Sequence, residues 1–140
     1  MVGVLIFCLV FGSVSGVFAA SASDIAEHWA EDRLHDWIDR GLLSGYEDGT
    51  IRPNKPVTRA EFVSLVNRAF DFSEGSSHVP FFDVSIDHWS RDQIAHALHA
   101  GYIRGHEDGT FRPDREVSRQ EVAVMVAAIL QLDSSASADA

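Results

Sequence analysis

This sequence has little cysteine and little lysine, and it has no excess of basic charge. Cys8 is the only cysteine among the 140 residues, so disulfides cannot stabilise the fold. The 11 Lys and Arg residues face 21 Asp and Glu residues, and the formal net charge is −10. Nucleic-acid-binding domains usually carry a basic patch, so we expect no nucleic-acid partner. Lys55 is the only lysine, and the remaining cations are arginines, which suit bidentate contacts with carboxylate or phosphate groups.

The first 19 residues contain no charged side chain and are mostly apolar. Val17-Phe18-Ala19 places small residues at the spacing that precedes a signal-peptide cleavage site. We therefore interpret residues 1–19 as a signal peptide, cut after Ala19 or after Ala22, and we expect a secreted protein. The segment lacks the Lys or Arg that most signal peptides carry near their start, so a retained N-terminal anchor is the alternative.

The rest of the chain is built from one stretch that occurs twice, sixty residues apart. Residues 28–70 align with residues 88–130 without a gap, and 15 of the 43 positions are identical. A fixed period of this size indicates a repeated supersecondary unit that buries part of its apolar surface against a neighbour. The predicted organisation is a first unit over 24–70, a polar linker over 71–80, a second unit over 81–132 and a disordered tail over 133–140.

The first part of each unit is predicted to be a helix followed by a tight loop. Apolar residues at helical spacing indicate a helix from Asp24 to Arg40, ended by Gly41 in the left-handed conformation. Trp37 becomes Ala97 in the second unit, so the two units are not expected to pack identically. Asp48-Gly49 and Asp108-Gly109 predict a tight turn in each loop.

The second helix of each unit has the strongest sequence signals. Thr58 and Ser118 are predicted N-caps, and Glu61 and Glu121 follow three residues later, which predicts a capping box in each unit. Apolar residues at helical spacing then predict amphipathic helices over Thr58–Phe70 and Ser118–Leu130. The fold class predicted from these elements is all-α.

Arg59 and Arg119 each occupy the first position of a helix, where the macrodipole disfavours a cation. Neither has an acidic residue three or four positions onward to offset this. Two explanations remain open from the residues alone. Each arginine pairs with a loop acid such as Asp48 or Asp108 as a structural clamp, or it joins free backbone N–H groups to hold an external anion. In the second case, removing Arg59 is expected to leave folding almost unchanged.

The aromatic and histidine residues allow more than one interpretation. Trp29 and Trp89 each follow a histidine and could stack on a sugar ring, but aromatic residues at helical spacing are more often buried, and we favour burial. His96 and His99 have a spacing that could hold a metal ion, but a solvated helix face is the preferred interpretation. No acid pair, Ser-His-Asp set or phosphate loop has catalytic spacing. We therefore expect no metal site, no cofactor and no enzymatic activity.

The repeated unit resembles the S-layer homology repeat, which anchors exported bacterial proteins to the cell wall. The resemblance covers about residues 24–132. The matching segments are His28-Trp29-Ala30, Gly45-Tyr46 with Asp48-Gly49-Thr50 and Pro53-Asn54, Val57-Thr58-Arg59-Ala60-Glu61, Phe82-Asp83-Val84, His88-Trp89, Gly105 with Asp108-Gly109-Thr110-Phe111 and Pro113, and Ser118-Arg119-Gln120-Glu121.

The resemblance implies helix–loop–helix units, usually three in a row, with grooves between units that bind secondary cell-wall polysaccharide, often through a pyruvylated sugar. It places Arg59 near the acidic sugar, and so favours anion binding over the clamp. Arg119 carries over less securely, since its motif departs at two positions. The implied glycan contacts are Arg59, Arg119, Trp29, Trp89, Gly45 and Gly105.

The function implied is an exported cell-wall-anchoring module at the cell surface, held non-covalently by an acidic glycan. The alternative is a structural or protein-interaction module that assembles with another S-layer homology chain and has little glycan affinity. Only two units are present, and their unpaired apolar stripes are costly to expose. We therefore expect a homo-oligomer or a partner with such repeats.

Overall fold

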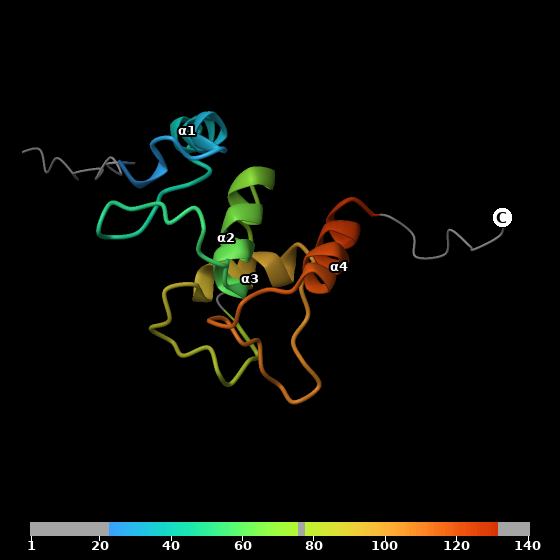
Figure 1. Cartoon of the computed structure of the whole chain (residues 1–140). Coiled ribbons are helices and arrows are strands. Elements are labelled where there is room, and N and C mark those ends of the chain that lie inside the picture. Colours follow the sequence, from blue (N-terminus) through green and yellow to red (C-terminus); the bar gives the residue numbers. More distant parts are fainter. Residues whose placement is uncertain (1–22, 76–77, 132–140) are drawn as a thin grey trace, which may run out of the picture.

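The computed structural model describes residues 23–75 and 78–131 (Figure 1). Four α-helices follow a short 3₁₀ turn, η1 (Ser23–Ile25). The helices are α1 (Glu31–Asp39), α2 (Arg59–Phe70), α3 (Arg91–His99) and α4 (Arg119–Ile129). The all-α class predicted from the sequence is confirmed. The expected signal peptide over 1–19 and the expected tail over 133–140 lie outside the described residues.

The first helix of each unit is shorter than predicted. Instead of running from Asp24, α1 begins at Glu31, because Glu27 has a φ of +64°, which a right-handed helix cannot contain. The ring of His28 then accepts a hydrogen bond from the Ala30 N–H (3.2 Å), and the same turn recurs at His88. Gly41 has a φ of +70°, so it ends α1 as predicted.

Both predicted capping boxes are present at the starts of α2 and α4. The Thr58 hydroxyl accepts from the Glu61 N–H (3.2 Å), and the Glu61 carboxylate accepts from the Thr58 N–H (2.7 Å). Ser118 and Glu121 form the same pair of bonds at 3.2 and 2.9 Å. These reciprocal bonds satisfy backbone groups that a helix end would otherwise leave unpaired.

The Asp-Gly loops are closed by their own aspartates. The Asp48 carboxylate accepts from the N–H (3.0 Å) and hydroxyl (2.6 Å) of Thr50 and pairs with Arg52 (2.6 Å). The bonds from Thr50, and then those from Arg52, lower the pKa of Asp48 to about 2. Asp108 repeats this arrangement with Thr110 and Arg112. Each loop is therefore closed by bonds between its own residues.

A second aspartate ties each loop to the start of its own unit. The Asp24 carboxylate accepts from the N–H groups of Ile51 (3.0 Å) and Arg52 (2.6 Å), and these bonds lower its pKa. Asp83 accepts from the N–H groups of Phe111 (2.8 Å) and Arg112 in the same way. Asp24 and Asp83 are 59 residues apart rather than 60, so the second unit carries one extra residue before His88.

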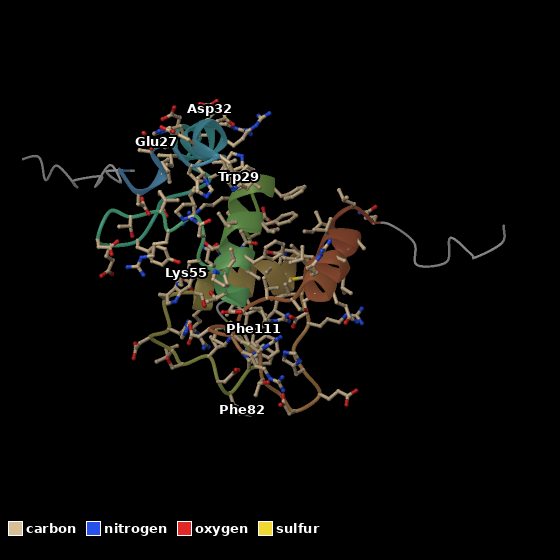
Figure 2. The ribbon with its side chains drawn as sticks, viewed as in Figure 1. Glu27, Trp29, Asp32, Lys55, Phe82 and Phe111 are labelled. Atoms are coloured by element: carbon tan, nitrogen blue, oxygen red, sulfur yellow. The ribbon has the colours of Figure 1, made fainter. Side chains whose placement is uncertain are left out.

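The hydrophobic core lies mainly in the second unit. Figure 1 shows α1 at one end of the molecule, with α2 leading from it to α3 and α4, and α2 packs directly against α3. Phe111 is fully buried in this core, and Figure 2 shows it in the interior, with Phe82 at the edge. Phe72 and Val79, from the expected polar linker, also pack in it. By contrast, α1 has no buried residue.

Candidate functional site

The two units are joined where α2 begins. The N–H of Arg59 donates to the Arg115 carbonyl (2.8 Å), and the N–H of Ala60 donates to the Pro113 carbonyl (2.9 Å). The Val117 N–H donates back to the Val57 carbonyl (3.0 Å). The hypothesis that free N–H groups at this helix start hold an external anion is therefore wrong for α2, because the loop of the second unit already occupies those groups.

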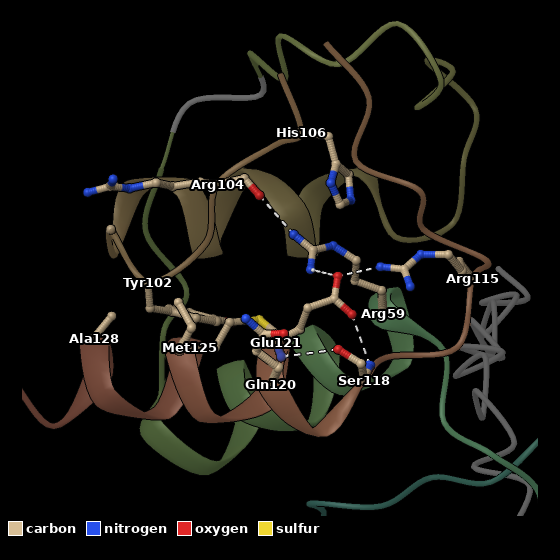
Figure 3. Close-up of a pocket in the computed structure, with 12 residues that line it drawn as sticks. Arg59, Tyr102, Arg104, His106, Arg115, Ser118, Gln120, Glu121, Met125 and Ala128 are labelled. Atoms are coloured by element: carbon tan, nitrogen blue, oxygen red, sulfur yellow. Dashed lines mark hydrogen bonds and ion pairs between the residues drawn. The ribbon is translucent and has the colours of Figure 1, made fainter. Parts of the chain in front are cut away.

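The Arg59 side chain crosses from the first unit into the second (Figure 3). It is only 5% exposed, and it donates to Glu121 Oε1 (3.0 Å) and to the Arg104 carbonyl (2.8 Å). Its guanidinium carbon lies 4.6 Å from the centre of the Phe111 ring, a cation–π distance. The proposed clamp on Asp48 is thus wrong, since Asp48 pairs with Arg52. Arg59 instead ties the two units together.

A cavity of about 630 Å³ lies beside this guanidinium, and we call it the Arg59 pocket. Its lining residues are Arg59, Gly101, Tyr102, Arg104, His106, Arg115, Ser118, Gln120, Glu121, Val124, Met125 and Ala128. Figure 3 shows Arg104 and Arg115 on opposite sides of Arg59, with residues of α4 forming the facing wall. Three arginines therefore line the pocket against one carboxylate, so it is positively charged within an acidic protein.

Two buried polar atoms at the pocket have no partner among the described residues. They are Nε of Arg59 and Nε2 of His106. Leaving a buried donor unpaired costs about 1–3 kcal/mol, and native proteins usually satisfy such groups with protein, water or ligand. An acceptor group that came within hydrogen-bond distance of the Arg59 Nε would satisfy this donor. The pocket thus has the charge to receive an anion, and two unpaired polar atoms lie in its wall.

Glu121 is the carboxylate that balances this charge. It pairs with Arg59 and with Arg115. Burial raises its pKa, but the hydrogen bonds from Ser118 and the charges of Arg59 and Arg115 outweigh burial, and the pKa falls to about 2. Burial lowers the pKa of Arg59, and the charge of Glu121 opposes that effect. Glu121 therefore remains ionised at neutral pH.

Replacing Glu121 by Gln is expected to weaken the acid sensitivity of the fold. Its pKa is below the ordinary value of 4.5, so the ionised form stabilises the fold fully above about pH 4.5, and this contribution is lost as the pH falls toward about 2. Gln keeps the capping box but carries no charge. Melting curves between about pH 6 and pH 2 should show a lower Tm for the variant at the upper end and a shallower fall. If the Tm of wild type and of Glu121→Gln fell equally with pH, the ionised Glu121 would not be a source of the acid sensitivity.

The structure places the six expected glycan contacts in different surroundings. Of these six residues, only Arg59 lines the Arg59 pocket. Arg119 is exposed, and it has no ion pair within residues 23–75 and 78–131. Gly45 has a φ of +70° and so serves the loop conformation. At Gly105 an added Cβ would lie 2.2 Å from Cε1 of Phe81, so this glycine makes room for a core ring.

The favoured burial of Trp29 and Trp89 is wrong. They are 90% and 59% exposed, because the His-Trp pairs form turns before α1 and α3 rather than part of a core-facing helix. Each indole lies near the ring of the preceding histidine, with centroids 5.6 and 6.0 Å apart. Both indoles are therefore available to a ligand.

A second cavity of about 1000 Å³ is lined mainly by the first unit, and we call it the first-unit groove. Trp89 and Gly45 line it, together with Tyr46, Lys55 and Glu61. It includes the counterparts, sixty residues earlier, of His106, Arg115 and Glu121. The two cavities thus occupy equivalent positions in the two units. Only the cavity of the second unit receives an arginine from the other unit.

Sequence reasoning missed Arg104, His106 and Arg115. Their counterparts in the first unit are Ser44, Tyr46 and Lys55, and only Lys55 shares the positive charge of its counterpart. The net charge of the loops gives no signal, because the second loop gains Asp114 and Glu116 as well as Arg104 and His106. Only the exchange of Ser44 for Arg104 and of Tyr46 for His106 marks this wall of the pocket. As to metals, the described residues contain no group of three or more His, Cys, Asp or Glu side chains arranged to hold an ion. None of the described helices is long and apolar enough to cross a bilayer.

Comparison with known proteins agrees with the repeat geometry. The family model described as the S-layer homology domain matches residues 23–63 and 80–123, which together are more than half of the chain. The chain belongs to the S-layer homology family. The two matches correspond to the two structural units, and the resemblance inferred from the sequence is confirmed. The S-layer homology unit of this chain is thus an η1 or equivalent turn, a helix, an Asp-Gly loop and a capped helix.

The relatives that carry these units are much longer proteins. "Cell surface glycoprotein 1" of Acetivibrio thermocellus is 32% identical over 136 residues, which are 87% of this chain and 6% of that protein. The "S-layer protein" of Bacillus licheniformis is 31% identical over 127 residues, 89% of this chain and 14% of that protein. The "Cellulosome-anchoring protein" of A. thermocellus is 30% identical over 103 residues, 71% and 23% respectively. The chain therefore spans less than a quarter of each of these relatives.

Proposed function

We propose that this chain attaches non-covalently to the bacterial cell surface by binding an acidic cell-wall polysaccharide in the Arg59 pocket. The S-layer homology family supports the surface role, since its members include proteins named for the S-layer, the cell surface and cellulosome anchoring. The ligand group that fits the pocket is a carboxylate carried by a sugar, of which a pyruvylated sugar is one example. We propose no reaction, since the site offers binding groups only.

The unpaired Nε of Arg59 is the observation that carries this proposal. The other two guanidinium nitrogens are held by Glu121 and by the Arg104 carbonyl, so the side chain is positioned before any ligand arrives. A carboxylate could accept from Nε and lie within the field of Arg104 and Arg115. Hydrogen bonds between ionised partners are stronger than those between neutral ones, and a preorganised donor loses little freedom on binding.

The exposed tryptophans suit the remaining part of a glycan chain. An indole presents a large apolar face that can cover a sugar ring while its N–H stays available. Trp89 lines the first-unit groove, and Trp29 projects from the turn before α1. We propose that the Arg59 pocket holds the charged sugar, and that Trp89 or Trp29 contacts further rings of the same polymer.

Replacing Arg104 by Ala is the direct test of the anion site. The Arg104 side chain is exposed, and only its backbone carbonyl bonds to Arg59, so the variant should fold normally. Loss of one nearby charge should weaken binding to purified cell walls by roughly tenfold, about 1.4 kcal/mol. Co-sedimentation isotherms, with walls before and after chemical removal of the secondary polymer, measure the effect. A melting curve checks the fold.

The matched control is Arg40→Ala, which removes an exposed arginine at the end of α1, away from the pocket. Arg40 pairs with Asp36 at the surface (3.3 Å), an interaction worth about 0.3–0.5 kcal/mol. Its loss should leave wall binding unchanged. Equal binding by wild type, Arg104→Ala and Arg40→Ala would reject the Arg59 pocket as the glycan site.

A second candidate function is a protein-interaction module, and the bare surface of α1 favours it. Trp37 is 43% exposed, whereas its counterpart Ala97 is fully buried against α2. Contiguous exposed apolar surface marks protein–protein interaction sites, and Leu34, Trp37 and Ile38 are the apolar residues of α1. The two functions are compatible, because the face on α1 and the Arg59 pocket lie on different units.

A further inference from the structure

The contact between the two units has two complementary halves. One half is α2, whose first N–H groups donate to loop carbonyls and whose side packs on α3. The other half is the second unit, which supplies α3, the loop carbonyls of Pro113 and Arg115, and the carboxylate of Glu121. Because the chain is a repeat, each half occurs twice. Within residues 23–75 and 78–131, one copy of each half contacts its complement, and the other copy has no complement.

The open copy of the first half is α4. Its leading residues Arg119 and Gln120 are exposed, whereas their counterparts Arg59 and Ala60 are buried. Their N–H groups have no backbone acceptor among the described residues, whereas those of Arg59 and Ala60 do. Val124, farther along α4, is also exposed. We call this surface the open α4 face.

The open copy of the second half is the first unit. The carbonyls of Pro53 and Lys55 correspond to those of Pro113 and Arg115, but they accept no backbone hydrogen bond from the described residues. On α1, Leu34 and Trp37 stand where α3 has buried residues, and none of the residues of α1 is buried. We call this surface, made of α1 and residues 53–57, the open first-unit face.

The first-unit groove is the pocket that the missing contact leaves empty. In the second unit, the Arg59 guanidinium occupies the corresponding place and bonds to Glu121. In the first unit, Glu61 lines the groove with Tyr46 (2.7 Å) and Lys55 (3.5 Å) beside it. The groove, at about 1000 Å³, is larger than the Arg59 pocket, at about 630 Å³, as expected for a site that lacks its inserted side chain.

We propose that a second copy of this chain docks its open α4 face onto the open first-unit face, head to tail. Arg119 of one copy enters the first-unit groove of the other and pairs with Glu61. The N–H groups of Arg119 and Gln120 donate to the carbonyls of Lys55 and Pro53. The partner copy therefore supplies the residue that the first-unit groove lacks, in the same way that Arg59 supplies it to the second unit.

The contact between copies is weaker than the one within the chain. Asn67 donates to the Gln93 carbonyl (2.8 Å) and accepts from the Tyr102 hydroxyl (2.7 Å), but Ala127 and Leu42 replace Asn67 and Tyr102 in the docked pair. Without these bonds, association depends on the backbone bonds, on Arg119 and on apolar contact. A head-to-tail contact also leaves one open face on each end, so it extends into longer assemblies or closes into a ring.

The completed groove forms a second, less basic pocket. It combines Arg119 and Lys55 with Glu61, whereas the Arg59 pocket has three arginines against one glutamate. That it also takes an acidic sugar rests on the proposed function. The assembly itself does not, and the oligomeric state tests it separately from wall binding.

The first test is sedimentation of the full chain over a range of micromolar concentrations in the absence of glycan. Wild type should associate reversibly, and Arg119→Ala should weaken association by about tenfold or more. At a dilution where both proteins are monomeric, the melting curves should agree, because Arg119 has no ion pair among the described residues. The matched control is Arg112→Ala, which removes an exposed arginine of the second-unit loop whose ion pair is with Asp108 and which lies outside both faces, and it should associate like wild type. A wild type that stays monomeric at every concentration, or an Arg119→Ala variant that associates equally well, overturns the proposal.

The second test fixes the direction of docking by disulfide trapping. In a Cys8→Ser background, one protein carries Lys55→Cys and another carries Gln120→Cys. These positions correspond to Arg115 and Ala60, which take part in neighbouring backbone hydrogen bonds between the units at the start of α2. Mixing the two should yield the mixed disulfide faster than either protein alone forms its own dimer. Faster formation of a dimer from one variant alone indicates a symmetric contact and overturns head-to-tail docking.

Discussion

Replacing Arg59 by Ala is expected to lower the stability of the fold and to abolish wall binding together. The side chain is buried, bonds to Glu121 and to the Arg104 carbonyl, and lies over Phe111. A hydrogen bond to a charged group contributes about 1.5–3 kcal/mol, which corresponds to a fall in Tm of roughly 10 °C for a domain of this size. The sequence alone predicted that Arg59→Ala would leave folding almost unchanged. The structure predicts a loss of stability instead, because Arg59 joins the two units.

The matched comparison is Arg119→Ala, which changes the same residue type at the same helix position. Arg119 is exposed, so its loss should leave the melting curve of the monomer unchanged. Arg59→Lys should lie between wild type and Arg59→Ala, since an ammonium group cannot reproduce the planar fork of a guanidinium. Melting curves and wall-binding isotherms measure both properties. If Arg59→Ala melts like wild type, Arg59 does not hold the units together.

Replacing Phe111 by Ala is expected to cause the largest loss of stability of any change considered. Phe111 is fully buried, lies 5.4 Å from the ring of Phe81 and supports the Arg59 guanidinium. Deletion of a buried phenylalanine side chain costs about 3–5 kcal/mol, a large fraction of the total stability of a small domain. We therefore expect a mostly unfolded or strongly destabilised protein, measurable by urea denaturation.

Phe82→Ala is the matched control, because it removes the same side chain from the same unit. Phe82 is 76% exposed, and exposed substitutions usually change stability by less than about 0.5 kcal/mol. Comparable denaturation midpoints for Phe111→Ala and Phe82→Ala would mean that the core is not centred on Phe111. Because Phe111 also carries Arg59, a milder Phe111→Leu variant should retain the fold but show weaker wall binding.

These expectations follow from one property of the site, which is that two units build it. The first unit contributes Arg59, and the second contributes the loop, the carboxylate and the other basic residues. An isolated second unit would therefore keep the pocket walls but lack the arginine that enters them from the first unit. The same property explains why neither sequence-level alternative for Arg59 holds as first stated, since its partner is Glu121 of the other unit rather than a loop acid, and the helix-start N–H groups are already occupied. Arg59 is a structural tie whose free Nε is also the proposed ligand donor.

The local structure of the chain was determined by its sequence. The capping boxes of Thr58 and Ser118, the Asp-Gly turns and the glycine that ends α1 were all predicted, because each depends on residues within four or five positions of one another. The sixty-residue repeat and its motifs likewise identified the family without any tertiary information.

Only the tertiary structure decided which residues meet across the units. It paired Arg59 with Glu121 rather than with Asp48, exposed Trp29 and Trp89, and gathered Arg104 and Arg115 around one pocket. Contacts between residues 45 to 62 positions apart depend on how α2 crosses onto α3, and local propensities do not encode that packing. The repeat in the sequence predicts equivalent surroundings for equivalent residues. In the structure these residues differ in burial, because a neighbouring unit covers one copy and not the other.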